Sequence, residues 1–403
     1  MQPVDLIVIG CGMMGRRHIR GLGELERVAP GSIRLLAVCD TRQDAADAAA
    51  AEAEDLLGTR PKAFADLAQA LAAEPAIEAA DLVTDPRSHE ALAGLLFDAG
   101  IDVLCEKPLA PTVGGARRMV EAATRTGRVL GTAENNRRSP VNRLAKAVLG
   151  AGLLGTPNFA LELSIGPADR IVGTAWRHRL AMGGVLLDVG IHTGYILEYL
   201  LGPLHTVSAH TQCVQTRREG KEFDGTPAAV DVDSEDCFSA VLEFANGVQG
   251  HWTLHFASPG ETMGKRLILG DQGTMNVPGD RSGQPVAVRR GGDTVEGDAL
   301  VAQLPDYRLN DIETKLFGER PPSFKLQSQE TDRKLLAAEM LDFVEAIRTN
   351  RPPESDGAQG MRAVAVIHAI MESALAGRPV TLDEVLDGTL HAYQDRVEAA
   401  HMG

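Results

Sequence analysis

Three glycines near the amino terminus are spaced to receive a phosphate-bearing ligand. Gly10, Gly12 and Gly15 form the pattern GxGxxG directly after an apolar, β-branched run. The first glycine allows a tight turn, the second lets a pyrophosphate approach the backbone, and the third lets the next helix pack close to the strand. The first amides of that helix, Met13 and Met14, would face the phosphates. The spacing predicts a dinucleotide-binding turn; the alternative is a glycine turn that serves packing only.

Asp40 ends the second apolar run and is placed to recognise a ribose. A carboxylate there hydrogen-bonds the adenosine ribose diol and repels a 2′-phosphate, which favours NAD over NADP. Arg42 keeps NADP open, because a guanidinium two residues further on could bind that phosphate or stack on adenine. Arg42 could equally be a solvated residue at the start of a helix. NAD is the predicted cofactor, and NADP is the alternative.

Two other segments carry residues suited to proton transfer. Glu106-Lys107-Pro108 follows an apolar run, at the carboxyl end of a predicted strand where ligands bind in open α/β sheets. The peptide before Pro108 can adopt the cis form. Asp188 and His192 are four residues apart, so a helix would place both on one face. Taken singly, a lysine after a strand is usually a surface residue, and an Asp–His pair is more often structural than catalytic.

The elements that must position these residues alternate regularly in the first third of the chain. Predicted strands occupy 4–10, 33–40, 62–64, 77–84, 101–105 and 128–132. Predicted helices follow the glycine turn and occupy 43–57, 66–72, 90–99 and 113–125. Strict β/α alternation predicts a parallel, doubly wound sheet.

The pattern changes near Pro140. A helix at 141–149 precedes runs of alternating polarity, such as HTVSAHTQCV and CFSAVLEF, which predict a largely antiparallel sheet. Helices are predicted at 332–348 and 360–376, and long excursions from the sheet at 277–292 and 297–331. We therefore expect an α/β N-terminal Rossmann domain over 1–138, and a substrate-binding and oligomerisation domain over 139–403. The second domain is expected to be α+β, with a large, mostly antiparallel open sheet.

Composition excludes several classes of partner. The 403 residues carry a formal net charge of −15, which argues against nucleic acid or an anionic membrane as a partner. Five scattered cysteines without CxxC fit a reducing compartment, and no zinc-type spacing occurs, so no metal is expected. No run of 18 uninterrupted apolar residues is present, so a cytoplasmic location without a membrane span is expected.

At these residues the chain resembles the Gfo/Idh/MocA family, which includes glucose-fructose oxidoreductase and inositol dehydrogenases. The resemblance rests on GCGMMG with Asp40, TDPRSH at 84–89, LLFDAGIDVLCEKPLA, AENNRRSP at 133–140, AWRHRLAMGGVLLDVGIH and, near the carboxyl end, MLDFVEAIRTNRPPESDGAQGMRAVAVIHAIMESALAGRPV. EKP together with GG…D…H is a specific combination. Only the stretch from about 205 to 330 lacks a specific motif.

The resemblance implies a Rossmann domain, a second domain with a large open sheet, and an active site between them. It implies that Lys107 and His192 flank the substrate, with Asp188 beside the histidine. Positions implied to line the nicotinamide end of the cofactor are Thr84, Pro86, His89 and Glu106. Asn135 and Arg137 match the family's N-x-R, which shapes the site, and Asn135 is counted among the cofactor-binding residues. Trp176 and Arg177 match a pair that borders the substrate pocket.

Three departures from the family pattern bear on the substrate. Asn136 stands where the family often has tyrosine, and Arg138 where it has an aromatic residue. The common H-x-x-D becomes His192-Thr193-Gly194-Tyr195. Asn136 and Arg138 are therefore candidate substrate-binding residues, and the departures affect substrate identity more than reaction type.

The activity implied is hydride transfer between a secondary hydroxyl of a sugar, polyol or glycoside and a nicotinamide cofactor. His192 is the expected general base, because imidazole titrates near neutral pH. Asp188 would orient its ring, and Lys107 would stabilise the developing alkoxide. His178, His251 and His255 are weaker candidates for the base.

Two other functions stay open. One is a glycosidase that uses NAD+ transiently, by oxidation, elimination and re-reduction. The other is a non-catalytic, cofactor-sensing regulator. A homodimer or homotetramer is expected, because an open sheet with an apolar outer face needs a cover. The alternative is that the excursions at 277–331 cover that face.

Overall fold

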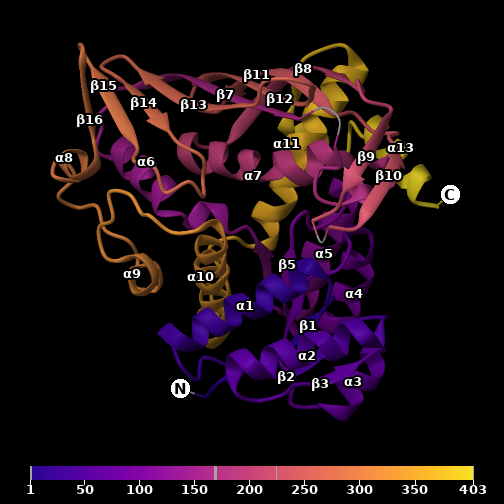
Figure 1. The fold of residues 1–403 in the computed structure, drawn as a ribbon. Helices are drawn as coiled ribbons and strands as arrows, with labels where there is room; N and C mark the ends of the chain where they lie inside the picture. The colour runs from indigo at the N-terminus through magenta and orange to yellow at the C-terminus, as the bar shows by residue number, and fades with distance from the viewer. Residues whose placement is uncertain (1, 168–169, 224, 403) are drawn as a thin grey trace. The chain divides into compact units, whose positions relative to one another are not determined.

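The computed structural model describes residues 2–167, 170–223 and 225–402, which form two compact units (Figure 1). Unit 1 comprises Met1–Ala110, Gly114–Asn135 and Gln327–Met361. Unit 2 comprises Pro111–Val113, Asn136–Leu326 and Arg362–Gly403. Each unit has its own large sheet, and the residues that could do chemistry divide between the two units.

Unit 1 is built on a six-stranded parallel sheet in the order β3-β2-β1-β4-β5-β6. Its strands are β1 (Val4–Ile9), β2 (Ile33–Cys39), β3 (Lys62–Phe64), β4 (Ala79–Leu82), β5 (Asp102–Glu106) and β6 (Leu130–Ala133). Its helices are α1 (Met13–Val28), α2 (Gln43–Leu57), α3 (Leu67–Ala73), α4 (Pro86–Asp98), α5 (Val113–Thr126) and α10 (Ser328–Thr349). The strand order reverses direction between β1 and β4, and ligands of such sheets bind at that switch point.

Local chemistry explains where the helices of unit 1 begin and end. Helix α2 stops at Gly58, whose φ of 75° is left-handed and costs a glycine little. Helix α4 begins at Pro86, four residues before the predicted start. The reason is a capping arrangement: the Asp85 side chain accepts the Arg87 amide, and proline is favourable in the first turn.

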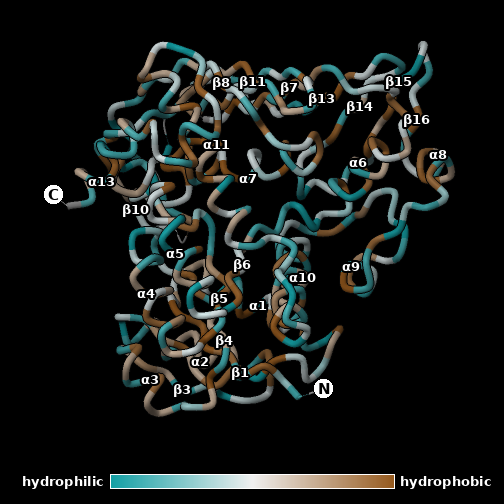
Figure 2. The backbone as a smooth tube through the Cα atoms, turned by 180° about the vertical axis from the view of Figure 1, so that it is seen from behind, coloured by the Kyte–Doolittle hydropathy of each residue, from teal (hydrophilic) through white to brown (hydrophobic). Residues whose placement is uncertain are grey.

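Helix α10 packs along α1, as both views of the chain show (Figures 1 and 2). Arg17 of α1 forms an ion pair with Asp332 of α10. A Cβ atom at Gly21 would lie 2.7 Å from the Leu336 Cβ, so the small residue permits the close approach. A helix from the stretch 139–403 thus joins unit 1, while the domain boundary predicted at residue 138 stays a prediction.

Unit 2 contains a nine-stranded sheet in the order β16-β15-β14-β13-β7-β12-β11-β8-β17. Its strands are β7 (Pro157–Pro167), β8 (Leu204–Gln212), β11 (Cys237–Phe244), β12 (Gln249–Ser258), β13 (Met263–Gly270), β14 (Thr274–Val277), β15 (Ala287–Arg290), β16 (Asp293–Glu296) and β17 (Val380–Thr381). β9 (Arg217–Lys221) and β10 (Pro227–Asp231) form a separate ribbon. Only β7 and β12 pair in parallel among the described strands of the large sheet, which confirms the predicted fold class.

The described helices of unit 2 include two that cover one face of its large sheet. The helices of this unit are α6 (Pro140–Gly150), α7 (Gly184–Leu201), α8 (Gly297–Val301), α9 (Asp311–Phe317), α11 (Gly357–Ala376), α12 (Leu382–Leu386) and α13 (Ala392–Met402). A Cβ at Gly190 of α7 would lie within 4 Å of Trp252 and Leu254 on β12 and of Ile367 on α11. Helices α7 and α11 therefore cover the face that carries Trp252, and residues alternating with Trp252 point the other way.

The prediction that residues 277–292 and 297–331 form long excursions from the sheet is wrong in part. β15 pairs with β14, and β16 pairs with β15, so the sheet continues through residues 287–296. These strands were missed because each has only four residues and they flank the paired glycines Gly291 and Gly292. Helices α8 and α9 occupy part of 297–331.

One segment, Leu180–Leu201, has the length and apolar composition of a membrane span. Within unit 2, however, 72% of its most apolar window is buried, as expected for the core helix of a globular unit.

Candidate active site

The glycine turn of unit 1 combines tight packing with an open approach. A Cβ atom at Gly10 (φ 95°) would lie 2.5 Å from the Val83 carbonyl oxygen, and one at Gly15 would lie 1.8 Å from the Gly10 oxygen. At Gly12, by contrast, a Cβ would have no described atom within 4 Å. The lack of a side chain at Gly10 and Gly15 therefore lets strand and helix pack closely, while Gly12 leaves room for a pyrophosphate at the start of α1.

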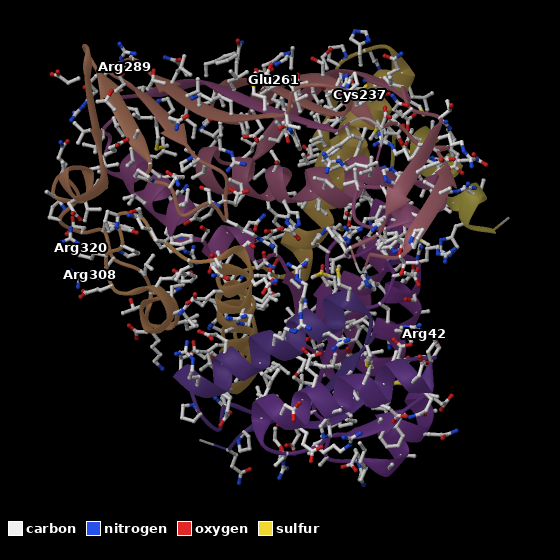
Figure 3. The ribbon with its side chains drawn as sticks, viewed as in Figure 1. Arg42, Cys237, Glu261, Arg289, Arg308 and Arg320 are labelled. Carbon is white, nitrogen blue, oxygen red and sulfur yellow. The ribbon has the colours of Figure 1, made fainter. Side chains whose placement is uncertain are left out.

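Asp40 is fixed against this turn. One of its carboxylate oxygens accepts the Cys11 amide at 2.8 Å, and the other accepts the Arg42 amide at 2.9 Å. A carboxylate oxygen has two lone pairs, so each can still accept a ribose hydroxyl. The Arg42 side chain is exposed at the start of α2 (Figure 3). These contacts fit the diol of an adenosine ribose.

His89 ties together the loops that follow β4 and β5. Its ring is fully buried, with Nε2 3.1 Å from the Thr84 oxygen and Nδ1 3.1 Å from the Pro108 oxygen. Burial lowers the pKa of His89, and the surrounding carbonyl oxygens together with Glu106 offset part of that effect. Pro86 is also buried, in the first turn of α4. The ring of His89 thus positions Thr84 and the loop after Lys107.

Lys107 follows β5 at the carboxyl edge of the parallel sheet. Its amide donates to Glu106 Oε2 at 2.7 Å, and the Lys107–Pro108 peptide is cis, as the motif suggests. Strand register pairs Ile9 of β1 with Leu82 of β4, and Leu82 with Cys105 of β5. Lys107 therefore stands at the edge of the sheet that carries the glycine turn.

Beneath Lys107 lies a buried charge cluster that the sequence analysis missed. His18 Nδ1 is 2.9 Å from Asp81 Oδ2, and His18 Nε2 is 3.4 Å from Glu106 Oε1. Burial by itself lowers the pKa of His18, but the two carboxylates outweigh it and raise that pKa well above 6.5. His18 lies on the buried face of α1 with Gly15 and Ile19, and this polar residue in an apolar stripe was the available signal. An imidazolium thus fixes the carboxylate next to Lys107.

In unit 2, Asp188 and His192 share helix α7, which is continuous through Gly190. Asp188 is buried and its Oδ2 lies 3.3 Å from Arg177 Nε. The Arg177 guanidinium also lies 5.1 Å from the centroid of the Trp176 ring and 5.5 Å from that of Phe223. Arg177 is therefore held by one ion pair and two aromatic rings beside Asp188. That Asp188 orients the His192 ring stays a prediction.

The other candidate histidines lie in different settings. His178 is fully buried, and its Nε2 accepts the Val172 amide at 2.9 Å. Burial, together with the nearby Arg218, lowers the pKa of His178 to about 4, so this ring is neutral at pH 7. His251 and His255 alternate with Trp252 and Leu254 on β12, so they point away from the face that α7 covers.

Two of the residues that depart from the family pattern, Asn136 and Arg138, are buried in a short 3₁₀ helix, Asn136–Arg138. Asn136 Oδ1 accepts Arg281 Nε at 2.9 Å, from the loop after β14. The Arg137 guanidinium lies 4.6 Å from the centre of the Tyr199 ring on α7. This 3₁₀ helix is thus joined to both α7 and the loop after β14.

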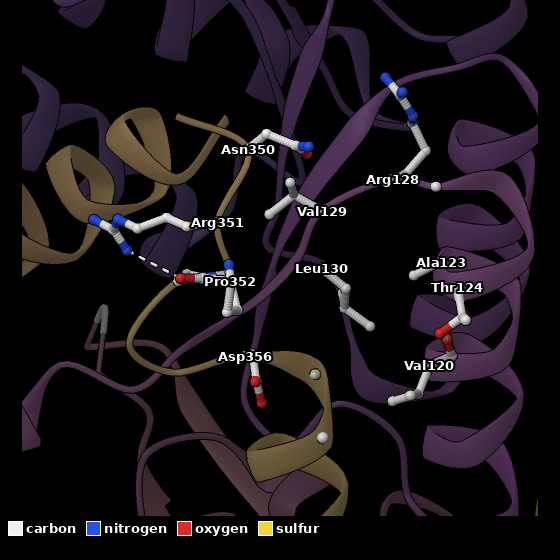
Figure 4. A pocket seen from close by; sticks show the side chains of 14 residues that line it. Val120, Ala123, Thr124, Arg128, Val129, Leu130, Asn350, Arg351, Pro352 and Asp356 are labelled. Carbon is white, nitrogen blue, oxygen red and sulfur yellow. Dashed lines mark hydrogen bonds between the residues drawn. The ribbon is translucent and has the colours of Figure 1, made fainter. Parts of the chain in front are cut away.

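A groove of about 380 Å³ in unit 1 lies away from the glycine turn (Figure 4). It runs between α5 and the loop after α10, and Arg128 and Val129 bring it to the first residues of β6. The amino ends of parallel strands lie at the edge opposite the ligand edge. This groove is therefore not the cofactor site.

The predicted site residues divide between the units. Unit 1 holds Gly10, Gly12, Met13, Met14, Gly15, Asp40, Arg42, Thr84, Pro86, His89, Glu106, Lys107 and Asn135. Unit 2 holds Asn136, Arg138, Trp176, Arg177, Asp188 and His192. Because Lys107 and His192 belong to different units, their action on one substrate stays a prediction.

Known proteins resemble the chain over most of its length. A D-apiose dehydrogenase from Paraburkholderia graminis is 25% identical over 380 residues, which cover 93% of this chain and 88% of that protein. Inositol 2-dehydrogenase 2 from Saccharopolyspora erythraea is 34% identical over 248 residues, 61% of this chain and 64% of that protein. A levoglucosan dehydrogenase solved with NADH and L-sorbose superposes with a TM-score of 0.76 at 25% identity, covering 95% of this chain and 99% of that one.

Family models account for both units. The model for the NAD-binding Rossmann fold of the oxidoreductase family matches residues 4–134, and the model for its C-terminal alpha/beta domain matches residues 146–382. The first match confirms the predicted cofactor, and the geometry of Gly12 and Asp40 fits it. The chain belongs to the Gfo/Idh/MocA family of NAD-binding oxidoreductases.

Proposed function

We propose that this protein is an NAD-dependent dehydrogenase that acts on a secondary hydroxyl of a sugar, polyol or glycoside. The observation that carries the proposal is the position of Lys107. It stands at the carboxyl edge of the same sheet as the open glycine turn, and Glu106, fixed by His18, precedes it. Relatives named for oxidation of apiose, inositol and levoglucosan support the substrate class.

Bound NAD+ would supply a hydride acceptor, held by the amides at the start of α1 and by Asp40. In our proposal His192 takes the hydroxyl proton on a ring nitrogen, and the Lys107 ammonium donates a hydrogen bond to the same oxygen. Asp188, which is paired with Arg177, stabilises the charge that His192 acquires. NADP is the alternative cofactor, because the exposed guanidinium of Arg42 could bind its 2′-phosphate.

His192→Ala tests the proposed role of the imidazole. We expect turnover with the best substrate of a sugar and polyol panel to fall by at least ~10²-fold, because general bases contribute about this much. NAD+ affinity, measured by fluorescence titration, should persist. His210→Ala, an exposed histidine on β8, is the matched control. An unchanged turnover in His192→Ala would remove the residue from the mechanism.

The same assay separates the dehydrogenase from the glycosidase that recycles NAD+. NADH absorbance and aglycone release are recorded together with glycosides present. A dehydrogenase accumulates NADH without releasing aglycone, whereas a glycosidase releases aglycone without net NADH.

We also propose a cytoplasmic homodimer or homotetramer, joined through the open face of the unit 2 sheet. That face carries Leu161 on β7 and its register partner Leu267 on β13, both part-exposed. A second subunit would cover these side chains.

A further inference from the structure

A second pocket, wholly within unit 2, has a volume of about 450 Å³. We call it the β13 pocket. Its lining includes Glu162, Ser164, Thr193, Gly264, Arg266 and Asp280. Thr193 directly follows His192 on α7, so the pocket borders the helix that carries the proposed base.

The floor of the β13 pocket is a fixed network of ion pairs. Arg266 Nε donates to Glu162 Oε2 at 2.6 Å, and Arg266 Nη1 donates to Asp280 Oδ1 at 2.6 Å. The same Asp280 oxygen accepts Asn142 Nδ2 at 3.0 Å. Glu162 and Arg266 are each 7% exposed. Both partners of Asp280 thus bind Oδ1, and no hydrogen bond reaches its Oδ2 from the described residues.

The contacts within this network determine the charges of Asp280 and Arg266. Burial raises the pKa of Asp280, but Arg266, the hydrogen bonds from Arg266 and Asn142, and the nearby His192 outweigh it and lower that pKa. Asp280 is therefore an anion. Burial lowers the pKa of Arg266, and the carboxyl groups of Asp280 and Glu162 more than reverse this, so Arg266 is a cation. Burial also raises the pKa of Glu162, although the contact with Arg266 offsets part of that effect.

This chemistry selects a class of ligand. The charge of Arg266 is compensated from both sides, so it offers little attraction to an anion. Lys265 also lines the pocket, but strand alternation directs its side chain to the opposite face of the sheet from Arg266. Asp280 Oδ2 is an acceptor, and the hydroxyls of Ser164 and Thr193 both donate and accept. A ligand that carries several hydroxyl groups and no negative charge matches this lining.

We propose that the β13 pocket binds the hydroxyl-bearing ring of a neutral polyol or sugar, and that Asp280 accepts a hydrogen bond from one of its hydroxyl groups. Asp280 then determines which polyols are oxidised at the hydroxyl beside His192. This inference rests on the proposed dehydrogenase function, because it assigns the part of the substrate that does not react.

Gly264 permits a steric test that leaves the ion pairs intact. Gly264 lies two residues before Arg266 and on the same face of β13, and a Cβ there would meet no described atom within 4 Å. Gly264→Leu should therefore fold normally and fill the pocket. Gly260→Leu, on the loop before β13, is the matched control, because a Cβ there also has no described atom within 4 Å.

The first measurement is a thermal shift with saturating NAD+. Probes are myo-inositol, 1,5-anhydro-D-glucitol, levoglucosan and the anionic galacturonate. We expect a neutral polyol to raise the Tm of the wild type and of Gly260→Leu but not of Gly264→Leu, while the shift from NAD+ alone is equal in all three. A polyol shift retained in Gly264→Leu, no shift with any polyol, or a shift only with galacturonate would overturn the assignment.

Asp280→Asn tests hydroxyl recognition directly. On the panel member with the highest kcat/KM, removal of one particular hydroxyl should lower the wild-type kcat/KM by at least about tenfold, because a buried acceptor is left unpaired. Asp280→Asn should lower kcat/KM by a comparable factor with the parent polyol. In this variant, removal of the same hydroxyl from the polyol should lower kcat/KM little further. Asp293→Asn, an exposed carboxylate on β16, should behave as wild type. Equal losses for the parent and for every deoxy analogue would refute the role of Asp280.

The two proposals fail in different ways. If the wild type forms NADH but Gly264→Leu matches it in KM and polyol binding, the pocket assignment is wrong and the dehydrogenase stands. If polyols bind in a Gly264-dependent manner but no NADH forms, the proposed activity is wrong and the pocket stands.

Discussion

At the scale of single residues, the most consequential group is one that takes no direct part in the proposed chemistry. His18 is 2% exposed and bridges Asp81 and Glu106 in the core of unit 1. Removing one partner of a buried ion pair leaves an uncompensated charge, which typically costs about 3–5 kcal/mol. The charge of His18 is therefore coupled both to the stability of unit 1 and to the placement of Glu106 beside Lys107.

The protonation of His18 can be predicted with its sign. Because its folded-state pKa is raised well above 6.5, the folded protein holds this proton more tightly than the unfolded chain. The stabilisation is complete below pH 6.5 and is lost as the pH rises through the folded-state pKa. At pH 8, long-range ¹H–¹⁵N NMR should show both ring nitrogens of His18 protonated. A neutral ring at pH 8 would contradict the buried ion pair.

His18→Gln should also change the linkage between pH and unfolding. Near pH 8, unfolding of the wild type should release about one more proton than unfolding of the variant. That difference makes the wild-type unfolding free energy fall more steeply with pH, by up to about 1.4 kcal/mol per unit. Urea unfolding at pH 7.5 and 8.5 measures this slope, with His210→Gln, at an exposed residue of β8, as the control. Equal slopes in His18→Gln and wild type would show that no proton is held there.

At the scale of elements, the six residues that lead from β1 into α1 contain one glycine that close packing requires, Gly15, and another that leaves room for a ligand, Gly12. A side chain at Gly15 collides with backbone, whereas one at Gly12 meets no described atom in the ligand-free chain. The conflict at Gly15 cannot be relieved by a rotamer change, because its nearest atom is the Gly10 carbonyl oxygen. The two glycines should therefore respond differently to the same substitution.

Gly12→Ala and Gly15→Ala form a matched pair. Gly12→Ala should retain the wild-type Tm but bind NAD+ at least about tenfold more weakly, since the added methyl occupies the approach of the pyrophosphate. Gly15→Ala should lower the Tm itself, because strand and helix must separate. Calorimetry and NAD+ titration on both variants check this. Normal NAD+ affinity in Gly12→Ala would place the pyrophosphate elsewhere.

Elements with strong local signals were predictable from sequence, and those that depend on distant pairing were not. β11 was predicted over its observed bounds because CFSAVLEF has an alternating pattern, and in the structure buried and exposed residues alternate from Phe238 to Phe244. β15 has only four residues, and its place depends on pairing with β14 rather than on a local pattern.

The same division applies to the candidate site. GxGxxG and EKP carry local signals, so Gly12, Asp40 and Lys107 could be placed from sequence alone. Glu162 and Arg266, in contrast, are 104 residues apart and meet only because β7 and β13 pair in a register that no local pattern specifies. Residues of the β13 pocket were therefore missed.

At the scale of the whole molecule, the open face of the unit 2 sheet is the feature that calls for a partner. The outward sides of β7 and β13 alternate with buried residues and carry Leu161 opposite Leu267, Phe159 opposite Leu269, and Leu163 opposite the exposed Lys265. A contiguous apolar patch of this kind on a chain with net charge −15 favours burial against another subunit, because exposed apolar area is costly and charge keeps the remaining surface solvated.

Leu161→Glu should dissociate the proposed oligomer. The side chain points away from α7, so a carboxylate can stay solvated in the monomer but would be buried without a partner in a symmetric interface. We expect light scattering coupled to size exclusion to show a dimer or tetramer for the wild type and a monomer for Leu161→Glu, with NAD+ affinity retained. Ala48→Glu, on the exposed side of α2, should leave the assembly intact. A wild type that is monomeric at micromolar concentration, or a Leu161→Glu variant that assembles normally, would mean that this face stays open to solvent.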